Sequence, residues 1–89
     1  MSRQRSIEKV MSSDYVTIGE LVRITNSRYS TLKYYTEEGM LPFEQEDTQL
    51  TRRYKRLDSI QRINEIKDLK KQGLSINEIK DKLQNNVSF

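Results

Sequence analysis

Donor side chains gather on one face of a predicted helix in the first half of the chain. With helical spacing, Ser30, Lys33 and Tyr34 share a face, and all three can donate hydrogen bonds. Leu32 and Tyr35 form the apolar face that would pack on a core. A short helix of this kind in a small basic protein is typical of a helix that enters the major groove of DNA.

The sequence RRYKR supplies a second group of donors in the middle of the chain. Because side chains alternate along a strand, Arg53 and Lys55 would share one face. Arg52, Tyr54 and Arg56 would share the other, where we expect Tyr54 to anchor the strand on the core. Arginine matches phosphate oxygens with paired donors, so the run favours contact with the DNA backbone over a merely solvated charged face.

Charge is unevenly distributed along the 89 residues, although the net charge is only +3. Residues 36–51 carry five acidic groups and no basic group, whereas residues 52–56 carry four basic groups. The segments 1–35 and 57–89 each hold six basic groups, against three and five acidic ones. Basic segments on both sides of an acidic one indicate two places where a polyanion could bind.

The composition argues against several classes of protein. Cysteine and histidine are absent, which excludes disulfides and thiolate metal sites and removes the commonest general base. The carboxylates form no tight constellation, and Glu44, Glu46 and Asp47 are expected at a solvated tip and not at a metal site. We therefore expect no catalysis, no metal and no cofactor.

The sequence also bears on location. No apolar run approaches the roughly 18–20 residues that span a bilayer, and the N-terminus lacks the apolar core of a signal peptide. We expect a cytoplasmic, nucleoid-associated protein with no membrane partner.

Two short helices are predicted to position the donor face. Thr17 and Glu20 have the spacing of a capping box at the start of the first helix, and Asn26 suits the left-handed conformation at its end. The second helix is expected from residue 28 or 29 to residue 38, followed by Gly39. Two helices joined by about three residues make a helix-turn-helix.

The segment 43–56 is predicted to form a two-stranded ribbon, because Pro42 opposes a helix and the centre of the segment is polar. Its returning strand would carry residues 52–54. Phosphates would repel the acidic tip, so we expect the tip to point away from a duplex while the returning strand stays close to it.

A second helix pair follows. Isoleucine or leucine recurs every three residues through a predicted helix at 57–72, which Gly73 ends. Ser75 and Glu78 form another capping box before a last amphipathic helix. The domain is expected over residues 15–84.

The domain is flanked by an N-terminal extension at residues 1–14 and a tail at residues 85–89. The extension is either flexible or a short helix with Ile7, Val10 and Met11 on one side.

Four pieces of the sequence occur in a recognisable order. They are YVTIGELVRIT at 15–25, TLKYYTEEGMLP at 31–42, RRY at 52–54 and KKQGLSINEIKDKL at 70–83. Together they resemble the DNA-binding domain of the MerR family of transcription regulators. The resemblance implies a mainly α fold: a winged helix-turn-helix with a short two-stranded β wing and a second helix pair.

The resemblance also implies a sequence-specific, double-stranded DNA-binding domain of a transcriptional regulator. It implies that the second helix and the wing face DNA and that the start of the first helix lies near a phosphate. Tyr29 either covers the start of the second helix or stacks on a sugar or base. The candidate DNA-binding residues are Thr17, Arg28, Tyr29, Ser30, Lys33, Tyr34, Arg52, Arg53 and Lys55.

The chain departs from the family pattern at several positions. Lys33 stands where arginine is usual, which keeps the charge but loses bidentate geometry. Thr36 stands where glutamate is usual, and Arg28 takes the place of a serine N-cap. Leu50 and Thr51 precede the arginine pair where glycine is frequent, so we expect a wing turn of different shape.

The oligomeric state and the biological role stay open. Family members usually continue into a dimerisation helix, whereas this sequence stops at Phe89. We favour a domain boundary there over a naturally minimal protein or a homodimer formed through the N-terminal extension. The same DNA-binding face would also serve a plasmid or chromosome segregation protein or an architectural, excisionase-like protein. A protein-interaction module is the remaining alternative.

Overall fold

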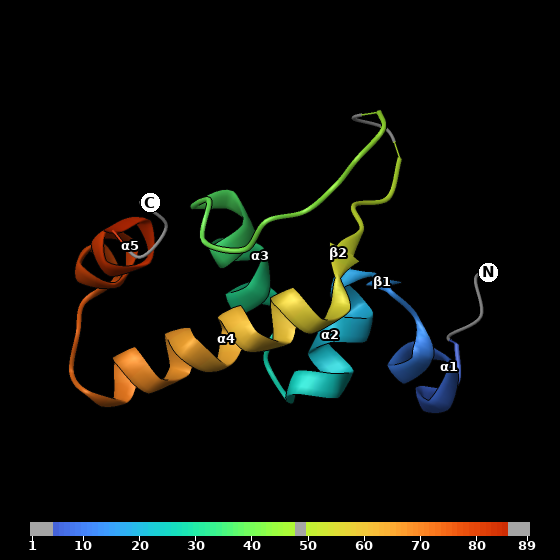
Figure 1. The fold of residues 1–89 in the computed structure, drawn as a ribbon, viewed down its shortest axis with the longest axis horizontal. Helices are drawn as coiled ribbons and strands as arrows, with labels where there is room; N and C mark the ends of the chain where they lie inside the picture. Colours follow the sequence, from blue (N-terminus) through green and yellow to red (C-terminus); the bar gives the residue numbers. More distant parts are fainter. Residues whose placement is uncertain (1–4, 48–49, 86–89) are drawn as a thin grey trace.

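The predicted helix-turn-helix is formed by α2 (Ile18–Thr25) and α3 (Tyr29–Glu37). The computed structural model describes residues 5–47 and 50–85, and Figure 1 shows the arrangement of the elements. The predicted capping box is present: Thr17 Oγ1 accepts the Glu20 N–H at 3.2 Å, and the Glu20 carboxylate accepts the Thr17 N–H at 2.9 Å. Asn26 ends α2 in the left-handed conformation, so the chain turns directly into α3.

The end of α3 is also the predicted one. Gly39 has a φ of 76°, which residues with a side chain rarely adopt. The Met40 N–H donates a hydrogen bond to the Tyr35 carbonyl at 2.9 Å, which ends the helix. Leu32 and Tyr35 are buried, which confirms the predicted apolar side of this helix, and Met40 just beyond the helix is buried as well.

The second helix pair comprises α4 (Arg56–Lys71) and α5 (Ile76–Asn85). Gly73, with a φ of 92°, lies between them. The predicted capping box at the start of α5 is present: Glu78 Oε1 accepts the Ser75 N–H at 2.8 Å, and Ser75 Oγ accepts the Glu78 N–H at 3.2 Å. Figure 1 shows α4 running along one side of the helix-turn-helix, with α5 turned back beside α3. The buried apolar residues of this pair are Ile63, Ile66, Leu69, Ile79 and Leu83.

The two-stranded antiparallel sheet is present, but its partner strand differs from the expected one. β2 (Tyr54–Lys55) pairs with β1 (Tyr15–Val16), the segment just before α2. The outgoing side of the expected ribbon pairs with the returning side at a single bridge, between Glu44 and Arg53. The physical reason is burial: Val16 and Tyr54 face each other in the core, whereas the polar segment after Glu44 has no apolar surface to bury.

Arg56 also departs from the expected alternation. It is the first residue of α4 and not part of the ribbon. Its N–H donates to the Asp14 carbonyl at 2.9 Å, and its Nε donates to the Ser13 carbonyl at 2.8 Å. The guanidinium of Arg56 is therefore held against the N-terminal segment.

The N-terminal segment contains a short helix, α1 (Ile7–Ser12). Val10 is fully buried in the common core, whereas Ile7 and Met11 are about half exposed. Val10 is therefore covered within the chain, which leaves Ile7 and Met11 as the exposed apolar residues of this helix. Among residues 5–47 and 50–85, no helix is long and apolar enough to cross a membrane.

Candidate nucleic-acid interface

The exposed face of α3 carries the predicted donors. Ser30, Lys33 and Tyr34 are all exposed. Tyr34 is 43 % exposed although the centre of its ring lies 6.2 Å from that of the buried Tyr35. Neighbouring residues on a helix point about 100° apart, so only one of the two tyrosines enters the core. The arrangement leaves one ammonium and two hydroxyl groups on a single solvent-facing surface.

The N-terminus of α3 is open. Arg28 occupies the N-cap position, its side chain makes no capping hydrogen bond, and it is exposed. Tyr29 follows with 54 % of its surface exposed. Free N–H groups at a helix N-terminus favour an anion, and the Arg28 guanidinium adds positive charge beside them.

The N-terminus of α2 presents a second set of donors. The oxygen of the Thr17 hydroxyl accepts from Glu20, which leaves its own O–H to donate elsewhere. The N–H groups of Ile18 and Gly19 have no acceptor among the described residues. A phosphate placed here would meet the Thr17 O–H and these two N–H groups.

The wing is the segment between Glu44 and Arg53, and the bridge between these two residues forms its base. The side chain of Arg53 is 57 % exposed. Its guanidinium carbon lies 5.4 Å from the centre of the Tyr15 ring, and Nη2 lies 3.9 Å from a carboxylate oxygen of Glu46. An exposed ion pair of this length contributes at most about 1 kcal/mol, so a phosphate can replace Glu46 at little cost.

Arg52 points to the other side of the strand. Its guanidinium carbon lies 4.7 Å above the ring of Phe43, which in turn lies 6.1 Å from the Tyr54 ring. Tyr54 is fully buried, as predicted. Arg52 is half-buried and packs over this aromatic pair, so it has less freedom to reach a duplex than Arg53 has.

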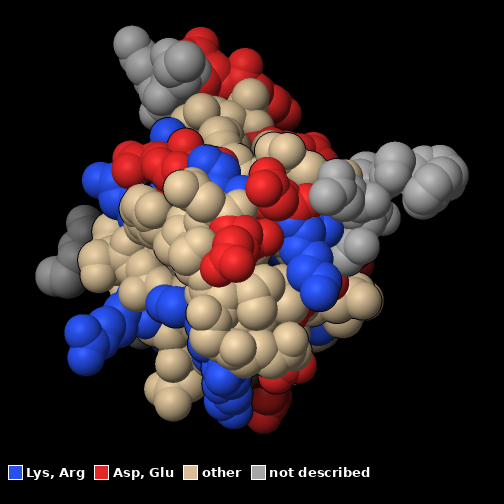
Figure 2. Space-filling model, turned by 90° about the vertical axis from the view of Figure 1, so that its left-hand side faces the viewer, with Lys and Arg blue, Asp and Glu red and all other residues tan. Residues whose placement is uncertain are grey.

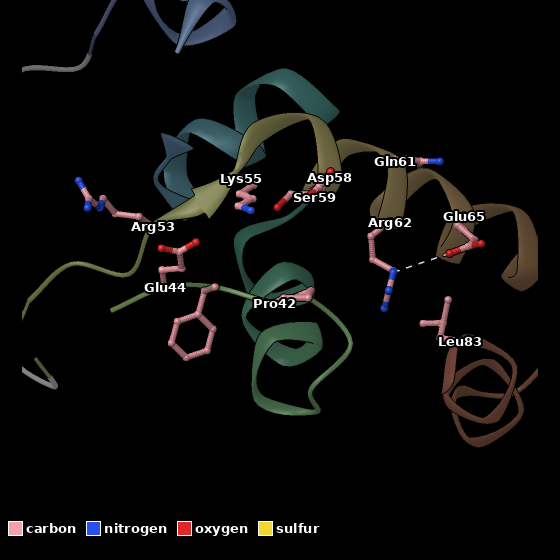
Figure 3. A pocket seen from close by; sticks show the side chains of 11 residues that line it. Pro42, Glu44, Arg53, Lys55, Asp58, Ser59, Gln61, Arg62, Glu65 and Leu83 are labelled. Atoms are coloured by element: carbon pink, nitrogen blue, oxygen red, sulfur yellow. Dashed lines mark ion pairs between the residues drawn. The ribbon is translucent and has the colours of Figure 1, made fainter. Parts of the chain in front are cut away.

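Lys55 lines an open groove of about 540 Å³ between the wing base, the first half of α4 and Leu83 (Figure 3). Arg53 lines the same groove, as the alternation along the strand predicts. The other charged residues around it are of both signs, namely Glu44, Asp58, Arg62 and Glu65. Because the charges are mixed, the groove is a poor site for a polyanion.

Three basic residues of the second helix pair have partners within the fold. Lys67 donates to the Thr25 carbonyl at the end of α2 at 2.8 Å, and Arg62 donates to the Met40 carbonyl at 3.0 Å. Lys80 pairs with Glu38 at 2.9 Å, which raises the pKa of Lys80. Figure 2, which shows the end of the molecule near α5, has basic and acidic side chains interspersed on the described surface. The second polyanion site suggested by the charge count is therefore not formed as one basic surface on this face.

Tyr15 is a residue that sequence reasoning missed. Its hydroxyl donates to the Glu44 carboxylate at 2.9 Å, and this hydrogen bond raises the pKa of the Tyr15 phenol. Tyr15 thereby contacts both residues of the wing bridge, Glu44 and Arg53. A strand of two residues has no periodicity, so no signal in the sequence pointed to it.

No group of three or more acidic side chains that could hold a metal ion exists among the described residues. A buried hydrogen bond between Thr36 of α3 and Tyr54 of β2 connects the helix that carries the exposed donors with the strand that follows Arg53. What the arrangement offers chemically is a set of exposed cationic and hydroxyl donors.

Comparison with known proteins agrees with this geometry. The family model described as the MerR HTH family of regulatory proteins matches residues 16–86, which is most of the chain. Neither the curated proteins nor the solved structures contain a match. Because a family model covers well over half of its length, the chain belongs to the MerR family of helix-turn-helix regulatory proteins, a family of DNA-binding transcription regulators.

Proposed function

We propose that this chain binds double-stranded DNA sequence-specifically, with α3 in the major groove and the wing on the flanking backbone. The observation that carries the proposal is the division of α3 into a buried side, Leu32 and Tyr35, and an exposed side with Lys33 and Tyr34. Lys33 and Ser30 would read base edges, which differ between base pairs in the major groove.

The backbone contacts come from three places. Arg53 would reach a phosphate beside the recognition helix, with Arg52 and Lys55 adding positive charge to the same strand. Arg28 and Tyr29 would meet the backbone at the start of α3, and Thr17 would do so at the start of α2. Tyr34 would donate its hydroxyl to a phosphate.

We extend the proposal to a dimer on an inverted repeat. One short helix and one wing make few contacts, and a second copy would add a second half-site. A segregation or architectural protein would use the same surface. The description of the family as regulatory proteins favours a transcription regulator.

Titration of a duplex library by the wild-type chain, followed by titration of the best duplex with variants, tests the proposal. Lys33→Ala and Arg53→Ala should each weaken binding. Lys33→Ala should also relax the preference for the base pair that Lys33 contacts, whereas Arg53→Ala should weaken binding to all sequences and reduce the magnitude of the slope of log K against log salt by about one. Lys71→Ala is the matched control, since Lys71 is an exposed lysine at the end of α4 remote from the wing (Figure 1). Unchanged affinity and slope in both test variants would show that the proposed face is wrong.

A further inference from the structure

Arg5 lies ahead of the family match, yet its guanidinium makes four hydrogen bonds to the domain and its flank. Nε and Nη2 each donate to the Glu20 carboxylate at 2.7 Å. Nη1 donates to the Ser13 hydroxyl at 2.9 Å, and Nη2 also donates to the Tyr15 carbonyl at 3.3 Å. A bidentate pair with two further acceptors fixes the plane of the guanidinium.

The first consequence concerns the start of α2. Glu20 Oε1, which accepts from Arg5, is the same oxygen that accepts the Thr17 N–H of the capping box. The Glu20 side chain is only 11 % exposed, and the Arg5 guanidinium is the main cause that lowers its pKa. Arg5 therefore supports the carboxylate that holds the helix end carrying Thr17.

The second consequence concerns the wing. The Tyr15 carbonyl that Arg5 contacts belongs to β1, and β1 pairs with β2 at the wing base. The Tyr15 side chain contacts Arg53 and Glu44. A shift of β1 would therefore move the surroundings of Arg53.

The third consequence concerns α4. The Ser13 hydroxyl accepts a hydrogen bond from Arg5, and the Ser13 carbonyl accepts one from Arg56, the first residue of α4. The Arg5 carbonyl in turn accepts from Arg23 of α2 at 2.8 Å. The contacts of this one residue thus lead to the starts of α2, β1 and α4.

We propose that Arg5 is a positioning residue for DNA binding, which fixes the N-terminus of α2 and the wing base without contacting DNA. The proposal rests on the DNA-binding function proposed above. It assigns a role to the segment ahead of the family match, namely to hold the two outer DNA contacts, Thr17 and Arg53, in a fixed relation to α3.

The test compares Arg5→Ala, Arg5→Lys and Glu20→Gln with Lys9→Ala, which removes one exposed positive charge from the same segment. We expect Arg5→Ala to weaken duplex binding on the order of tenfold with an unchanged salt slope. Lysine cannot reproduce the paired geometry, so Arg5→Lys should be intermediate. Lys9→Ala should bind like the wild type.

Glu20→Gln separates positioning from simple electrostatics. Removing a negative charge near a duplex would raise affinity if charge alone mattered, whereas loss of positioning lowers it. We expect Glu20→Gln to bind the duplex more weakly than the wild type. The double variant Arg5→Ala with Glu20→Gln should bind no more weakly than the weaker of the two single variants. A salt slope that falls by about one in Arg5→Ala would overturn the proposal, because Arg5 would then be a phosphate contact.

Amide hydrogen exchange gives a readout that needs no DNA. Arg5→Ala should speed exchange at the Thr17 and Arg56 N–H groups while leaving Ile66, in the buried part of α4, unchanged. Unchanged exchange at Thr17 and Arg56 would overturn the proposal even if the wild type binds DNA. A wild type that binds no duplex while these amides respond would instead refute the DNA-binding function and with it the purpose assigned to Arg5.

Discussion

The hydroxyl groups of Thr36 and Tyr54 lie 3.0 Å apart in the buried space between α3 and β2. Thr36 donates its only O–H to the Leu32 carbonyl at 2.9 Å, so Tyr54 must be the donor in the pair. Thr36 stands where the family usually has glutamate. In this chain a neutral hydroxyl therefore joins α3 to β2.

This proton assignment predicts unequal effects for the two single substitutions. Thr36→Val leaves the Tyr54 hydroxyl buried without an acceptor, which should lower the free energy of unfolding by about 1–3 kcal/mol. Tyr54→Phe removes the donor but leaves Thr36 bonded to Leu32, so the loss should be about 0.5–1.5 kcal/mol. Urea unfolding of both variants measures the difference.

The double variant provides the check. Because it removes both partners, Thr36→Val with Tyr54→Phe should be less destabilised than the sum of the single variants. Strict additivity would mean that the two hydroxyls do not interact.

The parts of the fold that were predictable rest on neighbours in sequence. The capping boxes at Thr17 and Ser75, and the stop at Gly39, depend on residues three or four positions apart, where local chemistry decides the backbone. The pairing of β1 with β2 joins residues about 40 positions apart and was not foreseen. It depends on Val16 and Tyr54 meeting in the core, which only the assembled helices bring about.

The two capping boxes allow one chemical change to be made at two sites. Thr17→Ala and Ser75→Ala each remove a side-chain acceptor for an N–H group, so each should cost about 0.5–2 kcal/mol of stability in thermal or urea unfolding. Duplex binding is compared under conditions where both variants are folded. Only Thr17→Ala should bind more weakly than the wild type, because only Thr17 lies on the proposed interface. Equal DNA affinity in the two variants would remove Thr17 from the set of contacts.

Gly19 offers a substitution in which stability and DNA binding should change in opposite directions. An added Cβ would lie 3.9 Å from Thr17 Oγ1, which is ordinary contact, and alanine favours the helix. We expect Gly19→Ala to raise the free energy of unfolding by about 0.4–1 kcal/mol.

The same methyl group would stand at the N-terminus of α2, where a phosphate is proposed to approach the Gly19 N–H. Duplex affinity should therefore fall although the protein is more stable. Fluorescence titration and urea unfolding of the same preparation measure both quantities. An affinity equal to that of the wild type would argue that no phosphate lies there.

The candidate site was predictable to the same degree as the fold. The exposed donors of α3 follow from helical periodicity alone, which places Lys33 and Tyr34 opposite the stripe formed by the buried Leu32 and Tyr35. The contacts of Tyr15 and Arg5 could not be predicted, since each joins residues at least eight positions away through side chains outside the helices. The charge count also suggested a second polyanion site in this part of the chain. Arg62 and Lys67, however, donate hydrogen bonds to backbone carbonyls within the fold.

The Arg5–Glu20 pair should make stability depend on pH at the acidic end. The pKa of Glu20 is lowered from its usual 4.5, first by the hydrogen bond from Arg5, so the folded state binds this proton less readily than the unfolded state. The stabilisation is then fully present above pH 4.5 and is lost as the pH falls through the lowered pKa.

Glu20→Gln should melt at a lower temperature than the wild type at pH 7, and this gap in melting temperature should narrow below pH 4.5. Melting curves between pH 7 and pH 2.5 measure the gap, and a difference that stays constant over that range would show that the ionised Glu20 adds nothing to stability. Glu78→Gln is the comparison, because the pKa of Glu78 is also lowered, but by Ser75 and without an arginine partner. The difference in melting temperature between Glu78→Gln and the wild type should change in the same pH range, but by a smaller amount than for Glu20→Gln.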